Sequence, residues 1–168
     1  MAQIDFKEAT ILIKDGGAGS AQQSLEVKIG EGNFQYTEQR TIEYTLDRGL
    51  LDEVREGDEV PVDVTLDAIW DYISGGTATG AVPTVEDALK RRGPAAAWVS
   101  TDADSCRPYA VDLCIDYQPD CSASSVTQPD ELITISDFRY EQIDHDLRAG
   151  TLSITGRANV TEATAVRS

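Results

Sequence analysis

The stretch from Glu59 to Ile73, EVPVDVTLDAIWDYI, alternates apolar and acidic side chains with a period of two. Its apolar or aromatic set is Val60, Val62, Val64, Leu66, Ala68, Trp70 and Tyr72. The acids Glu59, Asp63, Asp67 and Asp71 belong to the other set. Because successive side chains of a strand point to opposite faces, this pattern predicts a strand with one apolar and one acidic face. At ~3.3 Å per residue the strand would extend roughly 50 Å, far beyond the usual ~17–20 Å.

A second stretch, Phe34 to Leu46, has the same design. Its even positions include Phe34, Tyr36, Ile42, Tyr44 and Leu46, whereas its odd positions, Glu43 among them, are wholly polar. The sequence therefore predicts a second long strand with one polar face.

The segment between these two strands, Asp47 to Asp58, is too long for a tight hairpin and predicts a functional loop. Leu50, Leu51 and Val54 are apolar residues in this otherwise charged segment. Two interpretations remain open. These side chains either pack back onto their own domain or form a docking surface for another subunit.

One helix is predicted after Pro83, where Thr84 can cap and Asp87 completes a variant of the capping box. Gly93 and Pro94 end it. Its apolar stripe, Val85, Ala88 and Leu89, is typical of a helix that packs against a sheet.

The remaining strands are predicted from the same two-residue alternation. They cover Ala9–Lys14, Ser24–Gly30, Tyr109–Tyr117, Glu131–Ile143 and Thr151–Val160. About seven strands and one helix predict a single, mainly β domain over residues 1–168, a β-sandwich or open barrel with the helix packed against it. Residues 1–31 are expected to contribute short strands or an arm.

The composition of the 168 residues narrows the function classes. Fourteen Lys and Arg against 30 Asp and Glu give a formal charge of −16, which argues against binding nucleic acid through its phosphates. Solubility, or life in high salt, is the simplest interpretation of this acidity. Three cysteines cannot all pair within one chain, and we expect neither a secretory signal nor a membrane span of ~18 apolar residues.

Residues that could carry chemistry are few. His145 stands in a predicted turn, and the spacing of Cys106, Cys114 and Cys121 is unlike that of zinc ligands. Asp102 and Asp104 resemble the start of a calcium loop that no glycine or distal glutamate completes. The aligned carboxylates of Asp63, Asp67 and Asp71 lack an aromatic-lined cleft. We therefore predict no enzyme activity, and no catalytic, cofactor or metal site.

Long phrases of the sequence resemble the tail tube (major tail) proteins of long-tailed bacteriophages. They are NFQYTEQRTIEYTLDRGLLDEVREGDEVPVDVTLDAIWDYI, TVEDALKRRG, STDADSCRPYAVDLCIDYQPDC and FRYEQIDHDLRAGTLSITGRANVTEA, in this order, from about Gly32 to Ala165. The family implies a sandwich-like β fold with one helix and hexameric rings stacked into a hollow tube through which DNA passes. It implies a place in the virion tail, assembled in the bacterial cytoplasm, and terminator, tip or baseplate, and tape measure proteins as partners.

The resemblance gives the two predicted surfaces a role. The acidic side chains are expected to line the lumen, and they are Glu43, Glu59, Asp63, Asp67 and Asp71. The loop at 47–58 is expected to join successive rings, through Asp47, Arg48, Leu50, Leu51 and Val54. An acidic wall repels phosphates within ~8 Å at physiological salt, so DNA would slide along it without binding.

Two alternatives remain. One is a non-enzymatic β-sandwich module for binding or virion decoration, which would expose clustered aromatic residues at its loop tips. The other is a secretion-system tube protein, which would share the architecture and differ in its cargo.

Overall fold

The computed structural model describes residues 9–30, 32–70, 75–76, 81–118 and 130–167. They form a mainly β fold with one α-helix, which confirms the predicted fold class. The first half contains β1 (Ala9–Lys14), the 3-10 helix η2 (Gly19–Ala21), β2 (Ser24–Val27), β3 (Phe34–Thr37), β4 (Arg40–Asp47), β5 (Leu50–Glu59) and β6 (Val62–Ile69). The second half contains α1 (Val85–Lys90), the 3-10 helix η3 (Gly93–Ala95), β7 (Val111–Tyr117), β8 (Glu131–Asp146), β9 (Thr151–Ala158) and β10 (Thr164–Arg167).

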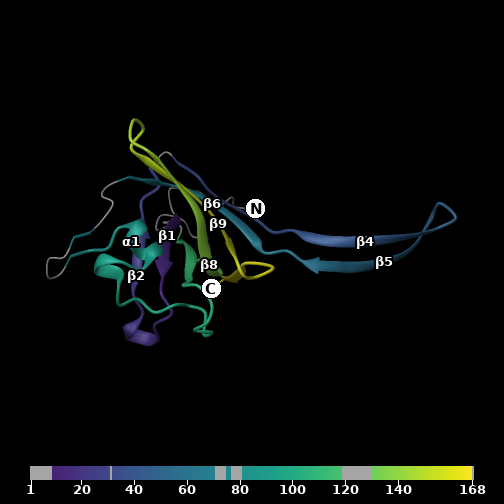
Figure 1. Ribbon diagram of the computed structural model, residues 1–168, viewed down its shortest axis with the longest axis horizontal. Helices are drawn as coiled ribbons and strands as arrows, with labels where there is room; N and C mark the ends of the chain where they lie inside the picture. The colour runs from purple at the N-terminus through teal and green to yellow at the C-terminus, as the bar shows by residue number, and fades with distance from the viewer. Residues whose placement is uncertain (1–8, 31, 71–74, 77–80, 119–129, 168) are drawn as a thin grey trace, which may run out of the picture.

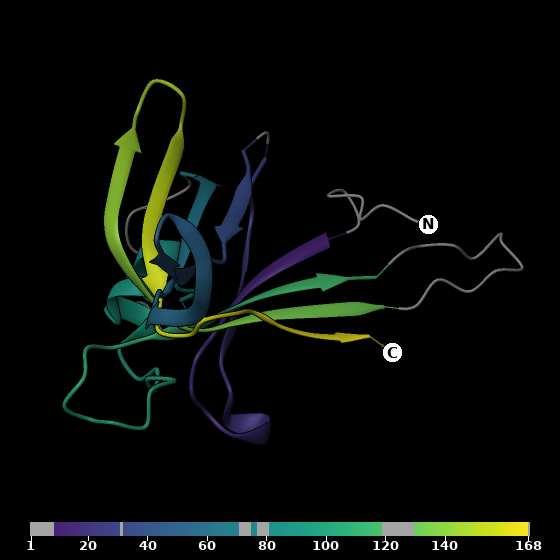
Figure 2. The same cartoon turned by 90° about the vertical axis from the view of Figure 1, so that its right-hand side faces the viewer.

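Eight of these strands form one antiparallel sheet in the order β2-β1-β7-β8-β9-β6-β3, with β10 paired to β8. The first half of β8 lies between β7 and β10, and its second half pairs with β9. Figure 2 shows the resulting division, with β1, β7, the first half of β8 and β10 running in this order, and with the second half of β8 and β9 rising steeply away from them.

The two ends of this strand order also meet. The backbone N–H groups of Asp67 and Ile69 in β6 donate to the carbonyls of Asn33 and Lys28, at 2.8 Å each. The chain that leaves β2 therefore joins the far side of the sheet at β6, and the sheet curls around a single core as an open barrel.

The core is built from the apolar set that the sequence predicted. Val62, Val64, Leu66 and Ala68 of β6 are fully buried. They share one cluster with the other inward-facing residues, among them Ile13, Leu113, Ile135, Phe138, Ile154, Ala88 and Leu89. The stripe of α1 thus packs against the sheet, as predicted.

The predicted capping box is confirmed at the start of α1. The Thr84 hydroxyl accepts from the Asp87 N–H, and the Asp87 carboxylate accepts from the Thr84 N–H. The helix ends at Lys90 because Arg91 adopts a left-handed conformation with φ 54°.

The two long strands that the sequence predicted are each interrupted. Phe34–Leu46 is divided between β3 and β4 at Glu38 and Gln39, and Glu59–Ile73 begins with the end of β5 and resumes as β6 after Val60 and Pro61. Pro61 has no N–H to donate, and a central proline is a common reason for a strand to break. Asp71 and the rest of 71–74 lie outside the described residues.

The prediction of a loop over Asp47–Asp58 is wrong. These residues form a two-residue turn at Arg48 and Gly49, with φ 52° and 83°, followed by β5. Positive φ at both central positions is the geometry that lets a tight turn follow the twist of a hairpin. β4 and β5 pair only with each other, as a two-stranded sheet. This extra hairpin and β10 explain why the described residues contain ten strands where about seven were expected.

Two smaller expectations also differ. The turn that the sequence placed around His145 begins only after Asp146, because β8 continues through His145 and pairs it with Leu152. Of residues 1–31, expected to contribute short strands or an arm, β1 lies inside the sheet between β2 and β7. Across the described part of the chain, no helix is long and apolar enough to span a membrane.

Candidate assembly surfaces

The hairpin of β4 and β5, here called the arm, projects from the barrel along the long axis of the molecule (Figure 1). Opposite residues in an antiparallel pair point to the same side. The register places Tyr44 opposite Val54 and Leu46 opposite Leu51, with Ile42 on the same side of β4. This face of the arm is therefore apolar toward the turn, and toward the barrel Glu56 lies opposite Ile42.

This apolar face is open to solvent. The exposed fractions are 62% for Tyr44, 60% for Leu46, 75% for Leu51 and 58% for Val54. A lone two-stranded hairpin is only marginally stable in water, and burying a leucine side chain stabilises by about 1.5–3 kcal/mol. A surface that covers this face would stabilise the arm substantially.

The opposite face of the arm is polar. Arg55 donates to Glu43 at 2.8 Å, and Thr45 lies opposite Glu53. Of the residues expected at a ring joint, Leu51 and Val54 belong to the apolar face. Leu50 lies opposite Asp47 and points to the polar side, and Arg48 stands in the turn.

A second surface covers the outer side of the barrel wall made by β3, β6, β9 and β8. Its side chains alternate with the core residues and are almost all polar. The members, here called the polar face, are Gln35, Thr37, Asp63, Thr65, Asp67, Arg139, Gln142, Asp144, Asp146, Thr151, Ser153, Thr155 and Arg157. Four of them are acids and two are arginines.

The charges on the polar face are unevenly paired. Arg157 forms an ion pair with Asp63 at 3.1 Å and approaches Glu141 at 3.8 Å. Among the described residues no cation pairs with Asp67 or Asp144, so this part of the polar face keeps its negative charge.

The five acids expected to share one surface are divided. Asp63 and Asp67 lie on the polar face, whereas Glu43 and Glu59 lie on the arm. Asp71 lies outside the described residues. The physical reason is the interruption of the strands, because Glu38–Gln39 and Val60–Pro61 separate the arm from the barrel wall.

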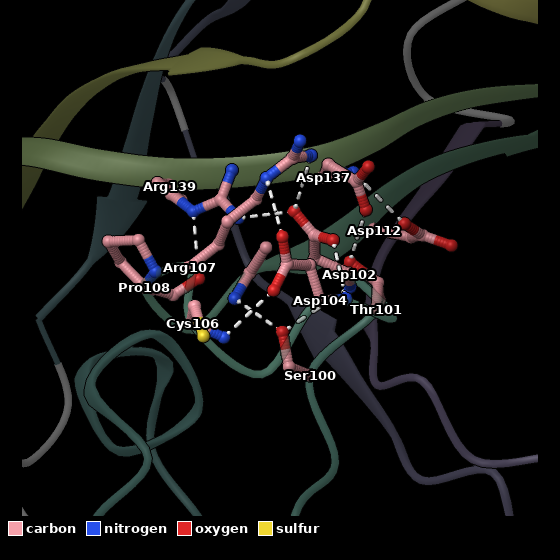
Figure 3. A network of polar contacts seen from close by, with 11 residues as sticks. Ser100, Thr101, Asp102, Asp104, Cys106, Arg107, Pro108, Asp112, Asp137 and Arg139 are labelled. Atoms are coloured by element: carbon pink, nitrogen blue, oxygen red, sulfur yellow. Dashed lines mark hydrogen bonds and ion pairs between the residues drawn. The ribbon is translucent and has the colours of Figure 1, made fainter.

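A polar network fixes the loop before β7 beneath β8, as Figure 3 shows. Asp102 accepts from Arg139 at 2.8 Å and from Arg107 at 3.4 Å, and Arg139 also donates to the Pro108 carbonyl. Backbone hydrogen bonds and these guanidinium groups lower the pKa of Asp102. Asp104 accepts from the Cys106 N–H at 3.0 Å, so both aspartates hold the conformation of this loop.

The same network holds β8 where it passes from β7 to β9. Asp137 has a left-handed φ of 58°, accepts from the Thr101 hydroxyl at 2.8 Å and donates its N–H to Asp112 at 3.2 Å. Burial raises the pKa of Asp112, with the Asp137 charge acting in the same direction.

His145 contacts Glu86, a fully buried carboxylate of α1 that also pairs with Arg92 at 3.1 Å and Lys90 at 3.8 Å. The imidazole packs edge-on against Trp70. His145 thereby ties the β8–β9 hairpin to the helix. This role could not be predicted from the sequence, since Glu86 is an ordinary first-turn acid in the helix pattern.

The described residues contain no group of three or more His, Cys, Asp or Glu that could hold a metal ion. Cys106 is exposed and Cys114 is buried, both as free thiols, and Cys121 lies outside the described residues.

Comparison with known proteins gives a likeness in fold to a solved structure. No family model and no curated protein matches the chain. A solved structure of the anti-feeding prophage cap, a tube-terminating cap, matches 100% of this chain and 93% of its own, with a TM-score of 0.51 and 10% identity. At this identity the likeness shows a shared fold. The fold shared with that cap protein is a mainly β barrel, and in this chain it carries a projecting arm.

Proposed function

We propose that this chain is a tail-tube subunit of a long-tailed bacteriophage or of a related phage-tail-like particle. Its copies form hexameric rings that stack into a hollow tube and meet terminator, tip or baseplate, and tape measure proteins in the assembled tail. In a phage, DNA passes through the tube during ejection. The observation that carries this proposal is the arm, a long hairpin whose apolar face is left uncovered by its own barrel.

Self-assembly accounts for the arm better than a monomeric binding module does. The exposed apolar residues of the arm lie along a strand pair rather than at clustered loop tips. A contact between unlike surfaces of identical chains closes into rings or extends into filaments, which are the two arrangements that a tube needs. The shared fold with a tube-terminating cap supports the same class of particle.

The polar face is the proposed lumen lining. It lies on the side of β6 opposite the core and the helix, so a ring could expose it to water while the apolar side stays buried. Its unpaired acids, Asp67 and Asp144, would repel DNA phosphates, and Asp63 contributes less because Arg157 neutralises it.

Polymerisation tests the proposal. The purified protein is expected to form hollow tubes or stacked rings in negative-stain microscopy. The double variant Leu46→Asp/Leu51→Asp places two charges on the apolar face and should remain folded and soluble without polymerising. The matched control Thr41→Asp/Thr45→Asp places the same charges on the opposite face of β4. Normal tubes from the leucine variant, or no assembly by the wild type, would overturn the proposal.

The lumen assignment has its own test. The variant Asp67→Lys/Asp144→Lys should form tubes of normal appearance that now retain short double-stranded DNA in a pelleting assay, with retention lost at high salt. The charge-matched control is Asp47→Lys/Glu53→Lys, which changes two acids on the polar face of the arm. Equal DNA retention by both variants would refute the lumen assignment.

A second candidate function is a tube-terminating cap, which the shared fold specifically favours. A cap binds the end of a tube and stops its growth. It would form single rings that do not stack, so the length distribution in the microscope separates the two candidates.

A further inference from the structure

A groove of about 560 Å³ lies between β2, the end of β6 and the start of α1. Apolar side chains dominate its lining, among them Leu25, Ile69, Val82 and Val85. Val82 is 70% exposed and Ile69 44%, so the groove presents apolar surface to solvent just as the arm does. The two lining residues with charge, Glu26 and Lys28, have opposite signs.

The groove and the arm lie on opposite sides of the molecule. Figure 1 shows α1 and β2 toward one end of the long axis and the arm at the other. The arm of one chain therefore points away from its own groove. A second copy placed head to tail along this axis would bring its groove toward the tip of the arm.

Charge distinguishes the groove from other surfaces that could receive the arm. The arm, residues 40–59, carries seven acids and three arginines. A concavity at its own base is lined by Glu38, Glu56, Asp58, Glu59 and Glu162 with Arg40 as the cation, and it would repel an acidic partner. Two arms facing each other would likewise bring like charges together. The groove is balanced, and Lys28 on its lining can meet the acids beside Leu51.

We propose that the apolar face of the arm docks into this groove of a second copy, head to tail. Leu46 and Leu51 cover the side chain of Val82, which buries apolar surface that each chain leaves exposed. The inference rests on the proposed self-assembly and names the surface that receives the arm.

Complementation between two variants tests it. Val82→Asp blocks the groove and leaves the arm intact, whereas Leu46→Asp/Leu51→Asp blocks the arm and leaves the groove intact. Neither should polymerise alone, and a mixture should form pairs through the one remaining contact, seen by sedimentation velocity. Val99→Asp, at a valine 53% exposed on another loop, is the matched control and should polymerise normally. Circular dichroism and thermal unfolding verify that each variant folds.

Disulfide trapping detects the same contact between arm and groove directly. In a background of Cys106→Ser and Cys121→Ser, mild oxidation of Leu51→Cys/Val82→Cys should give intermolecular dimers and ladders, at least tenfold more than Leu51→Cys/Val99→Cys. Polymerisation by Val82→Asp at the wild-type concentration, or equal trapping of the two pairs, would overturn the docking site and leave the tube proposal standing. If the wild-type protein never assembles, the tube proposal is wrong. If no trapped dimers form either, the proposed docking site is wrong as well.

Discussion

The barrel and the arm share one sequence pattern, but its apolar side chains are buried in the barrel and exposed on the arm. Both alternate apolar and polar side chains along antiparallel strands. In β6 the apolar residue Leu66 is fully buried, whereas Leu51 of the arm is 75% exposed. The alternation therefore specifies a strand with one apolar and one polar face in each case. In the barrel, other parts of the same chain cover the apolar face. We propose that another copy of the chain covers the apolar face of the arm.

The largest expected difference concerns the stability of the isolated subunit. Leu66→Ala should lower the free energy of unfolding by about 3–5 kcal/mol, because it leaves a cavity in the core. Leu51→Ala should change it by less than about 0.5 kcal/mol, since the Leu51 side chain is 75% exposed. Urea denaturation at a protein concentration too low for assembly measures both changes in the free energy of unfolding. Comparable losses from the two variants would mean that the arm packs on its own barrel.

The next effect concerns the turn of the arm. Gly49 has a φ of 83°, where a β-branched side chain is strained by about 1–2 kcal/mol. Gly49→Val should increase hydrogen exchange in β4 and β5 without shifting the urea midpoint of the barrel, because the two strands pair only with each other. A drop in the midpoint would show that arm and barrel unfold as one unit.

A smaller effect belongs to the barrel alone. The Tyr109 hydroxyl is buried without a hydrogen-bond partner among the described residues, so Tyr109→Phe should stabilise the subunit by about 1 kcal/mol. Burial raises the pKa of Tyr109 to about 12. The unfolded chain, with a tyrosine pKa of about 10, loses its proton first, so stability should fall between these pH values. The phenylalanine variant should lack this part of the alkaline loss, and an unchanged profile would contradict the buried hydroxyl.

The smallest effect concerns Asp112, whose pKa is raised by burial. A raised carboxyl pKa means that the folded state holds its proton longer, so the stability contribution falls as the pH rises through the folded pKa. Asp112→Asn keeps an oxygen that can accept from the Asp137 N–H and removes the charge. It should raise the melting temperature slightly at pH 7 and not below pH 3.5. A lower melting temperature at pH 7 would show that the charge itself holds Asp137.

The sequence was sufficient to predict the elements of the barrel wherever the apolar and polar side chains alternate regularly. The period of two in β6 identified its core residues, and the capping box at Thr84 located α1. The arm was missed for a specific reason. Leu51 and Val54 are three residues apart, which a regular strand would place on opposite faces, and a bulge at Asp52 returns them to the same face.

The candidate surfaces were only partly predictable. Alternation identified Asp63 and Asp67 as outward-facing, but it could not show that Arg157, far along the chain, neutralises the first of them. The division of the acids between barrel and arm depended on where the strands break. The groove combines β2, β6 and α1, which only the fold brings together.

The central claim is that a copy of the same chain covers the apolar face of the arm, and thiol labelling tests it most directly. In a background of Cys106→Ser and Cys121→Ser, Leu51→Cys and Thr45→Cys report on the two faces of the arm. Both thiols should react rapidly in the monomer. On assembly, labelling of Leu51→Cys should slow at least tenfold and more than that of Thr45→Cys. Unchanged labelling of Leu51→Cys in assembled particles would contradict the account.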